Sequence, residues 1–369
     1  MIDPNSSNVA ARLRERINRE GAITFRDWME AALYDSREGY YCRPDLTRWG
    51  RAGGDYRTSP ERSPLFAATF ARHFAALHQS LGSPRALTII EAGAGAGHFA
   101  CGVLETLRRS HASVFDATRY LIDEASADAR HRAQARLRPF DDRVEFRRLN
   151  EIESPIDACI IFSNELLDAF PVHRVTQREG RLFELCVGLS DSGDFVWVER
   201  EPTTPLLAAY LERARAHLAE GQIIEINLDA EEWMMRAASV LKRGYVVTVD
   251  YGAETSELYG APHRYEGTLR AFHQHRLIDD ALARPGEQDI TTTIDWTCIK
   301  KVGEECGLRT ISFERQDQFL LRVGLLDQLE IMTANASTEA DALILRAGAR
   351  EMILPGGLST SFQVLVQKR

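Results

Sequence analysis

The sequence predicts an α/β fold with a parallel sheet and helices on both faces, and three observations support this. Apolar, β-favouring runs alternate with helical patterns from residue 86 onward, which is typical of a parallel sheet. The stretch 87–99 has the pattern of a buried strand, a glycine-rich turn and the start of a helix. A length of 369 residues exceeds one average domain, so we expect a large domain with a smaller appended one.

The segment before the sheet is predicted to form a helical cap over residues 1–80. Apolar residues recur at helical spacing at Val9, Leu13 and Ile17, and Thr24 is a suitable N-cap for a second helix. A glycine-dense loop with aromatic residues follows at 50–61, and ordered loops of this length are often functional. We expect this loop to cover a ligand. The alternative is a surface connection whose tyrosines pack on the main domain.

Further strand patterns predict the core of the main domain at residues 81–252 and its completion at 294–369. Strands are expected at 119–124, 143–150, 157–162, 244–252, 308–313 and 361–366, in addition to the first at 87–91. Alternating hydrophobicity predicts a hairpin insertion at about 172–228. The polar stretch 253–293 is rich in His and Arg and is expected to be a second insertion, on the substrate side.

The glycine-rich turn indicates a ligand site at the end of the first strand. Glu91 is followed by Gly93, Gly95 and Gly97, whereas His98 stands where a dinucleotide-binding fingerprint has its third glycine. Glycines let the backbone turn sharply and a ligand come close, and an acid just before them suits a ligand that carries an ammonium group. The pattern resembles motif I of class I S-adenosylmethionine methyltransferases. A glycine-rich turn without a ligand is the alternative.

Polar residues follow the neighbouring strands, where parallel sheets bind their ligands. Asp123 and Glu124 end the second strand, and the carboxylate of either one could accept hydrogen bonds from ribose hydroxyls. Asn150 follows the third strand and is expected near an adenine ring, and Ser163 ends the fourth strand. Solvated acids at a strand end are the alternative interpretation of Asp123 and Glu124.

Asn164, Glu165 and Asp168 follow the fourth strand and are the candidate catalytic residues. Glu165 and Asp168 are three residues apart, so a helical turn would place both carboxylates on one face. Such a pair could hold a guanidinium or ammonium nucleophile through charge-assisted hydrogen bonds. Equally, Asn164 could cap a short helix whose dipole Glu165 complements. Pro171 would end the helix in both cases.

Composition narrows the class of protein. The chain is 44% hydrophobic and 27% charged, which is typical of a globular protein, and its net charge of −9 disfavours general nucleic-acid binding but suits a basic partner. Its six cysteines lack metal-ligand spacing, so we expect buried thiols in a reducing compartment and no metal site. No stretch approaches the length of a membrane span and the start lacks the pattern of a signal peptide, so we expect a cytoplasmic location.

Five segments in this order resemble the MidA-like family, which comprises the mitochondrial complex I assembly-factor methyltransferases and their bacterial relatives. The segments are 50–61, 91–97, 164–172, 249–252 and 285–291. The resemblance extends from about residue 20 to the C-terminus and implies a Rossmann-like, seven-stranded class I methyltransferase fold. It further implies S-adenosyl-L-methionine as the cofactor and, in the mitochondrial branch, a protein arginine as the substrate. We include Asp55, in the glycine-dense loop, among the cofactor-binding residues.

The sequence therefore predicts an S-adenosyl-L-methionine-dependent methyltransferase that transfers a methyl group to an arginine-type nitrogen of a protein. A small-molecule N- or O-methyltransferase is one alternative. An assembly factor of the same fold without catalysis is another, favoured by Leu166 and Leu167 in place of the aromatic pair usual in the family. The sequence is compatible with a homodimer, and neither nucleic acid nor a membrane is an expected partner.

Overall fold

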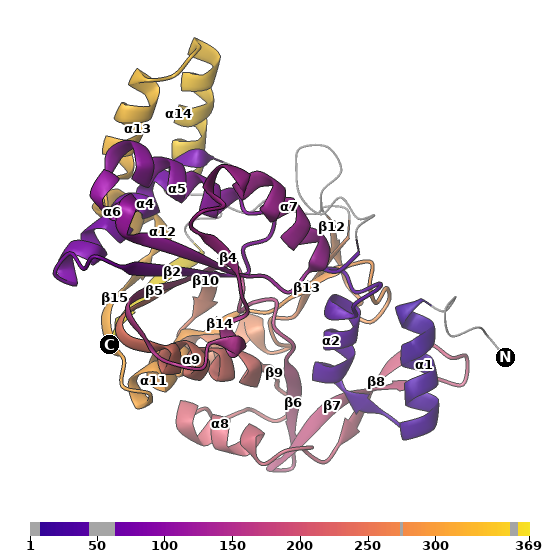
Figure 1. Cartoon of the computed structure of the whole chain (residues 1–369). Coiled ribbons are helices and arrows are strands. Elements are labelled where there is room, and N and C mark those ends of the chain that lie inside the picture. The colour runs from indigo at the N-terminus through magenta and orange to yellow at the C-terminus, as the bar shows by residue number, and fades with distance from the viewer. Residues whose placement is uncertain (1–7, 44–62, 274–275, 355–360) are drawn as a thin grey trace. The chain divides into compact units, whose positions relative to one another are not determined.

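The computed structural model describes residues 8–43, 63–273, 276–354 and 361–369. The chain forms two compact units and alternates between them along its length (Figure 1). The larger unit comprises Arg57–Leu166, Met234–Gly252 and Lys300–Arg369. The smaller unit comprises Met1–Tyr56, Leu167–Trp233 and Ala253–Ile299.

A mostly parallel sheet organises the larger unit. Its strands are β2 (Leu87–Ala92), β3 (Thr118–Asp123), β4 (Val144–Phe146), β5 (Ile156–Asn164), β10 (Leu241–Ala253), β15 (Arg309–Arg315) and β16 (Phe362–Lys368). They lie in the order β15-β16-β10-β5-β2-β3-β4. Neighbouring strands from β10 to β4 pair in parallel, whereas β16 runs antiparallel to both β10 and β15. The seven predicted strands, with the last at the C-terminus, are confirmed, and among the described residues the two-residue strand β14 (Ile294–Asp295) pairs with β10 as an eighth.

Aromatic residues attach helices to one face of this sheet. The helices of the larger unit are α4 (Pro64–Ser80), α5 (His98–Ser110), α6 (Ala112–Ala117), α7 (Ala127–Leu137), α12 (Gln316–Arg322), α13 (Leu325–Ala334) and α14 (Glu339–Ile353), with short 3-10 turns η1 (Arg138–Phe140) and η2 (Leu149–Glu151). Figure 1 shows α4, α5 and α12 over the same face. There Phe70 of α4, Phe99 of α5 and Phe162 of β5 pack together, and the ring centroids of Phe99 and Phe162 lie 4.2 Å apart.

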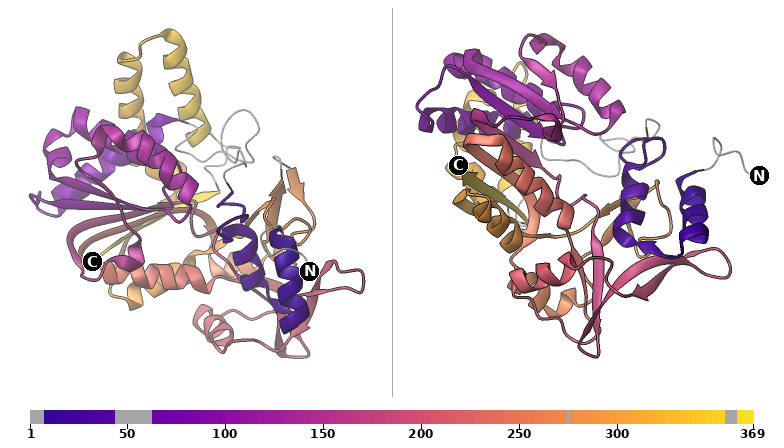
Figure 2. Two further views of the ribbon diagram at one scale, coloured as in Figure 1. Left: turned by 45° about the vertical axis from the view of Figure 1, so that its right-hand side comes forward. Right: turned by 60° about the horizontal axis from the view of Figure 1, so that its bottom comes forward.

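Two helices that begin in the smaller unit continue onto the opposite face of the sheet. They are α9 (Leu228–Val240) and α11 (Trp296–Glu305). Both helices form hydrogen bonds within the larger unit. The Arg236 guanidinium of α9 donates to the Leu149 carbonyl at 2.9 Å, and the Lys300 carbonyl of α11 accepts from the Gln367 amide group at 3.1 Å. Helices thus cover both faces (Figure 2), which explains why most residues of the central strands β2, β5 and β10 are buried.

The smaller unit contains two antiparallel sheets. Its helices are α1 (Val9–Glu20), α2 (Phe25–Tyr34), α8 (Leu206–Ala214), α10 (Thr255–Gly260) and the 3-10 turn η3 (Pro262–Arg264). One sheet contains β1 (Ile23–Thr24), β6 (His173–Arg178), β7 (Arg181–Leu189), β8 (Phe195–Arg200) and β9 (Ile223–Ile226), and the other contains β11 (Arg270–His273), β12 (Arg276–Ile278) and β13 (Asp289–Thr291). A further short strand is β14 (Ile294–Asp295). Phe25 and Trp28 of α2 share a core with Val187 of β7 and Ile290 of β13, so the N-terminal segment and both insertions form the expected smaller domain.

Some expected elements differ in extent. Residues 253–293 are not irregular but contain α10 and β11 to β13, because strands of three or four residues are too short to produce a periodic pattern. The third strand of the large sheet ends at Phe146 rather than at residue 150 and is followed by η2. Helix α4 packs its phenylalanines on the large sheet and belongs to the larger unit, not to an N-terminal cap. The loop at 50–61 lies outside the described residues.

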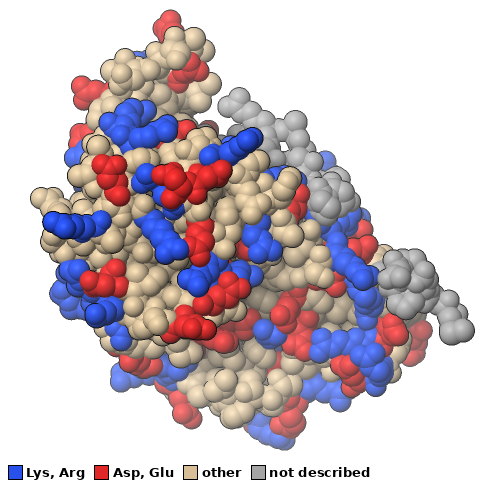
Figure 3. Space-filling model, in the orientation of Figure 1, with Lys and Arg blue, Asp and Glu red and all other residues tan. Residues whose placement is uncertain are grey.

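The surface carries charges of both signs, interspersed over the face in Figure 3. Many of them are paired, such as Arg243 with Asp157 at 2.9 Å. Three of the six free cysteines, Cys159, Cys186 and Cys298, are buried as expected, and the other three are half-buried. Within the ranges that the structure describes, every helix is too short or too polar to span a bilayer.

Candidate functional site

The glycine-rich turn after β2 has a backbone that only glycine adopts without strain. Gly93, Gly95 and Gly97 all have positive φ, at 71°, 52° and 75°. A Cβ atom on Gly95 would meet no other atom of the described residues within 4 Å, so these residues leave free space beside the turn. A Cβ atom on Gly97 would instead lie 3.1 Å from the Cβ of Ala133, because α5 begins there, close against α7. Gly95 thus leaves room for a ligand, and Gly97 allows helix packing.

Glu124 holds this turn in place. The amide of Gly95 donates to Glu124 Oε2 at 2.8 Å, and the amide of Ser126 donates to Glu124 Oε1 at 2.7 Å. Glu124 is buried, and burial raises the pKa of its carboxyl group, although the two amide donors oppose the rise. Both oxygens therefore have a backbone partner, and the carboxylate connects the glycine turn to the segment before α7.

Asp123, the other predicted ribose acid, points to a different partner. Arg148 donates from Nε to Asp123 Oδ1 at 2.5 Å. Burial raises the pKa of the Asp123 carboxyl group, and the Arg148 charge opposes that rise. The main-chain carbonyl of Asp123 accepts from the amide of Gly93 at 2.8 Å. Asp123 and Glu124 thus both contact the glycine turn, one through its backbone and the other through its side chain.

Glu91 lies in the interior beneath the turn. Tyr120 of β3 donates its hydroxyl to Glu91 Oε2 at 2.7 Å, and both residues are buried. Desolvation raises the pKa of Glu91 to about 8, while the Tyr120 hydrogen bond lowers it and the Glu124 charge raises it further. A cation placed beside Glu91 would favour its ionised form. Sequence reasoning missed Tyr120, because a tyrosine within a strand gives no signal of what it faces.

The end of β5 carries buried polar atoms. The hydroxyl of Ser163 and Oδ1 of Asn164 are buried and have no hydrogen-bond partner among the residues that the structure describes. The amide group of Asn164 donates to Glu165 Oε1 at 2.9 Å. Since buried polar atoms in proteins are nearly always hydrogen-bonded, these two atoms favour a polar ligand at this edge of the sheet.

A strained corner follows Asn164. Glu165 has a φ of 51°, a left-handed conformation that is uncommon for a residue with a side chain. The Glu165 amide donates to the Val249 carbonyl at 2.9 Å, and the Leu166 amide donates to Asp250 Oδ2 at 3.3 Å. Asp250, which follows Val249 on β10, is fully buried and also accepts from the Tyr251 amide, at 2.9 Å. Asp250 thus fixes the corner that presents Glu165.

The helical turn expected at 164–168 is absent, so the predicted shared helical face of Glu165 and Asp168 and the predicted helix cap at Asn164 are both wrong. The amides of Glu165 and Leu166 bond to β10 instead of to a helix, and the chain then makes a turn in which the Phe170 amide donates to the Leu167 carbonyl at 3.2 Å. Glu165 belongs to the larger unit and Asp168 to the smaller one, in which Asp168 is buried and its carbonyl accepts from the Thr292 amide at 3.0 Å.

Strand register brings most of the predicted residues to one edge of the sheet. Ala92 of β2 lies opposite both Asp123 of β3 and Ser163 of β5, and Asn164 lies opposite Val249 of β10. Asn150 is exposed, in η2. Asp55 lies outside the described residues. Asp250 was not singled out from the sequence as a site residue, although an acid at the end of a buried strand is the signal that could have identified it.

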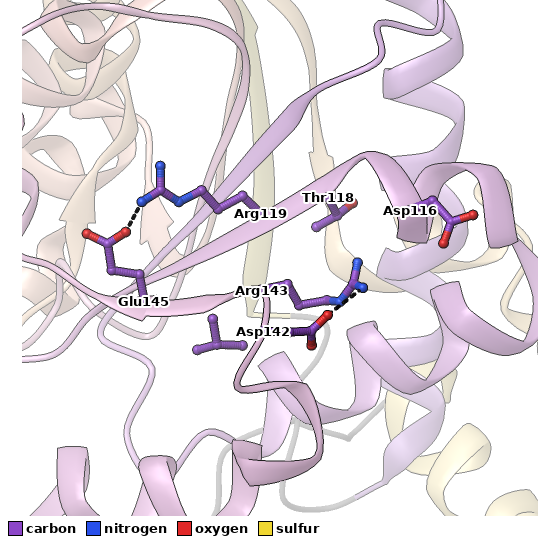
Figure 4. Close-up of a pocket in the computed structure, with 7 residues that line it drawn as sticks. Asp116, Thr118, Arg119, Asp142, Arg143 and Glu145 are labelled. Carbon is purple, nitrogen blue, oxygen red and sulfur yellow. Dashed lines mark hydrogen bonds and ion pairs between the residues drawn. The ribbon is translucent and has the colours of Figure 1, made fainter.

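A separate hollow of about 410 Å³ lies at the opposite edge of the sheet (Figure 4). It is lined by Asp116, Thr118, Arg119, Asp142, Arg143, Val144 and Glu145. Thr118 and Val144 begin β3 and β4, so the hollow lies at the amino ends of the strands. Its arginines are already paired, Arg143 with Asp142 at 2.9 Å and Arg119 with Glu145. It is therefore distinct from the edge that carries the glycine turn.

Metal ligands do not gather at either edge. Within the part of the chain that the structure describes, no three His, Cys, Asp or Glu side chains are grouped so that they could hold a metal ion.

Comparisons with known proteins agree with the site. The family model described as "Putative S-adenosyl-L-methionine-dependent methyltransferase" matches residues 69–314, about two thirds of the chain. A crystal structure from Burkholderia thailandensis with bound S-adenosyl-homocysteine superposes with a TM-score of 0.85 and 29% identity, covering 98% of this chain and 92% of that one. The mitochondrial protein arginine methyltransferase NDUFAF7 homolog of Drosophila melanogaster is 25% identical over 389 residues, covering 97% of this chain and 84% of the relative.

The human protein arginine methyltransferase NDUFAF7 is 23% identical over 365 residues, covering 89% of this chain and 77% of the relative. These relatives are mitochondrial proteins, which contradicts the cytoplasmic location predicted from the sequence. The prediction failed because unpaired cysteines indicate redox conditions and not a cellular address. The family match and the shared fold together establish that the chain belongs to the MidA-like family of class I methyltransferases, enzymes that use S-adenosyl-L-methionine as methyl donor.

Proposed function

We propose that the chain binds S-adenosyl-L-methionine at the edge formed by the glycine turn and the ends of β3 and β5, and methylates an arginine-type nitrogen of a protein. One observation carries the proposal. Free space lies beside Gly95 in the turn after β2, and the unpartnered polar atoms of Ser163 and Asn164 lie at the end of β5. Strand register places β2 and β5 side by side. An open turn and buried polar atoms without partners fit an extended, polar cofactor.

The cofactor-binding residues in this proposal are Glu91, Gly93, Gly95, Gly97, Asp123, Glu124, Asn150, Ser163 and Asp55. When bound, the cofactor supplies an electrophilic methyl group on a sulfonium. The glycine turn lets the cofactor approach the backbone. Each carboxylate oxygen has two lone pairs, so Asp123, which accepts from Arg148 and from the Leu149 amide, has capacity left for a ribose hydroxyl. Glu124 serves mainly to hold the turn.

Glu91 is the partner of the cofactor's ammonium group in this proposal. Its carboxyl group is buried next to Tyr120, and its pKa of about 8 makes it largely neutral at pH 7 when no cation is present. An ammonium group in contact with it would lower that pKa, because an opposite charge stabilises the carboxylate. Cofactor binding below pH 8 would then release a proton, a readout that does not depend on turnover.

We assign the acceptor side to Asn164 and Glu165 of the larger unit, and Asp168, in the smaller unit, stays a separate candidate catalytic residue. The Asn164 amide donates to Glu165 Oε1, which fixes the carboxylate, and Asp250 fixes the backbone that presents it. Methyl transfer requires the nucleophile to be aligned with the departing sulfur, so positioning dominates the chemistry. A carboxylate suits a planar guanidinium because it can accept two parallel N–H bonds.

Two findings support a protein arginine as the acceptor. The NDUFAF7 relatives that cover most of this chain are named protein arginine methyltransferases. The net charge of −9 favours a basic partner. A small molecule would need the same alignment with the methyl donor, so an assay must distinguish the two.

The test uses the purified chain, S-adenosyl-L-methionine with a trideuterated methyl group, and protein and metabolite extracts of source cells that lack the chain. We expect one trideuteromethyl group on the arginine of a protein. Glu165→Gln should lower the rate by about 10²-fold or more, as for loss of an electrostatic group, with cofactor affinity nearly unchanged. Glu153→Gln, at an exposed site just before β5, is the control and should keep full rate.

Label on a metabolite, or on an oxygen or lysine of a protein, would refute the proposed acceptor while leaving methyl transfer intact. Full turnover by Glu165→Gln would remove Glu165 from the reaction.

A further inference from the structure

The helices α13 and α14 form a hairpin that projects from the larger unit (Figures 1 and 2). The inner face of α14 is anchored by Ala342, Leu345, Gly348, Ala349 and Met352. Its outer face is nevertheless apolar: the side chains of Leu343 and Ile344 are 56% and 47% exposed, and Ala340 and Ala347 are exposed as well. In Figure 3 the projection carries acidic groups at its tip and sides, with uncharged surface between them.

These four residues form one continuous stripe along the helix, which we call the α14 stripe. They occupy positions 340, 343, 344 and 347, the spacing of one face of an α-helix and of the seam between two packed helices. A single exposed leucine needs no explanation. An apolar seam along a helix that is already anchored on its other side favours a second helix as its partner.

The charges beside the stripe indicate which partner fits. Glu339, Arg346 and Arg350 are seven and four residues apart, so all three lie along one flank of the stripe. All three are exposed, and no ion pair involving them is present among the residues that the structure describes. The flank is thus acidic at the start of the helix and basic toward its end.

This order of charges is self-complementary when two copies of the helix run antiparallel. In that arrangement each flank faces the same flank of the other helix in the reverse direction, so Glu339 faces Arg346 and Arg350 of the second copy. In a parallel pair each flank would instead face the opposite flank of the second helix, so Glu339 would not meet Arg346 or Arg350 and the three charges would have no complement in one another. Antiparallel pairing of identical helices is what a two-fold axis produces.

We propose that the α14 stripe is an interface between two copies of this chain, packed antiparallel about a two-fold axis near Leu343 and Ile344. A helix of 15 residues spans only about 22 Å at roughly 1.5 Å per residue. The interface is therefore small, at the low end of specific interfaces, and the dimer dissociates at concentrations on the order of 1–100 μM.

Sedimentation of the full chain over a range of concentrations tests the interface. The wild-type chain forms a dimer, and the double variant Leu343→Glu with Ile344→Glu stays monomeric, with association weakened by at least tenfold. The matched control is Leu206→Glu on α8, a leucine that is 58% exposed, and this variant dimerises like the wild type. A chain that is monomeric at several hundred micromolar, or a dimer that survives the double substitution, overturns the proposal.

Charge reversal tests the orientation. Glu339→Arg makes the flank wholly basic, and Arg346→Glu with Arg350→Glu makes it wholly acidic, so each variant alone self-associates at least tenfold more weakly than the wild type. Mixing the two restores a dimer, because opposite flanks then face each other. A mixture that associates no better than the separate variants overturns the antiparallel arrangement. A wild-type chain that stays monomeric and uses the α14 stripe to bind a different protein overturns the whole proposal.

Discussion

Replacing Glu124 by Gln tests whether this residue holds the glycine turn. The two carboxylate oxygens accept from the amides of Gly95 and Ser126 at 2.8 and 2.7 Å. A glutamine has a single acceptor oxygen, so it can satisfy one amide while its NH₂ group faces the other N–H. The substitution thus removes one charge-assisted hydrogen bond and leaves a donor without an acceptor at a buried position.

The expected loss follows from these contacts. A hydrogen bond to a charged group contributes about 1.5–3 kcal/mol, and an unsatisfied buried donor costs a similar amount. Part of this penalty is relieved if the turn shifts, so we expect the free energy of unfolding to fall by about 2–3 kcal/mol. For a unit of this size such a loss lowers the melting temperature by roughly 4–10 °C. Glu124→Ala loses both acceptor oxygens, so its free energy of unfolding and its melting temperature should fall further.

Calorimetry on the chain without cofactor measures this loss, because the contacts exist before any ligand binds. Glu124→Gln should also bind S-adenosyl-L-methionine more weakly, since part of the binding energy must restore the turn. Exposed Glu153→Gln serves as the control and should melt like the wild type. If Glu124→Gln weakened cofactor binding but melted at the wild-type temperature, Glu124 would be a ligand contact only, and the reasoning would be refuted.

Two further predictions concern Glu91 and Asp250. The pKa of Glu91 is raised to about 8 from its ordinary 4.5, so the folded state favours the protonated form. The contribution of this group to the free energy of unfolding, up to about 5 kcal/mol, is fully present below pH 4.5 and is lost as the pH rises through 8. Glu91→Gln should flatten this decline in unfolding experiments between pH 5 and 9, and an equally steep decline would assign it to other groups. Asp250→Ala frees the amides of Leu166 and Tyr251, and loss of the Leu166 bond, which holds the corner that presents Glu165, should lower turnover by about tenfold, at roughly 1.5 kcal/mol for that bond, with a smaller effect on cofactor affinity. Asp250→Asn keeps one acceptor oxygen, so its turnover should lie between those of the wild type and Asp250→Ala. Equal losses of turnover and of cofactor affinity would mean that Asp250 acts on cofactor binding and not on the position of Glu165.

The fold was predictable because its signals are local and repeated. The central strands of the large sheet contain compact apolar runs. Helix α4 likewise has a local start signal, a serine before a proline, and the Ser63 hydroxyl accepts from the Leu65 amide at 3.2 Å. The small strands β11 to β13 gave no signal, because three or four residues do not define a period. The division into two interleaved units depends on contacts distant in sequence, such as those between α2 and β13.

The candidate site was predictable only in part. Glycines and strand-end acids were identified because their positions follow from the backbone. Their partners were not, since nothing in the sequence pairs Glu124 with the Gly95 amide or Glu91 with the Tyr120 hydroxyl. The helix expected after Asn164 is absent for a related reason: the amides of Glu165 and Leu166 donate to β10, which lies far along the chain.

Cofactor binding by Gly95→Val tests the central claim most directly. Gly82 is a matched control, because it too has a positive φ and free space around an added Cβ, so Val causes comparable backbone strain at both positions. Titration calorimetry should show one S-adenosyl-L-methionine bound per wild-type chain and per Gly82→Val chain, and no binding to Gly95→Val, with circular dichroism checking that both variants are folded. If folded Gly95→Val bound the cofactor with wild-type affinity, the site would not lie at the glycine turn.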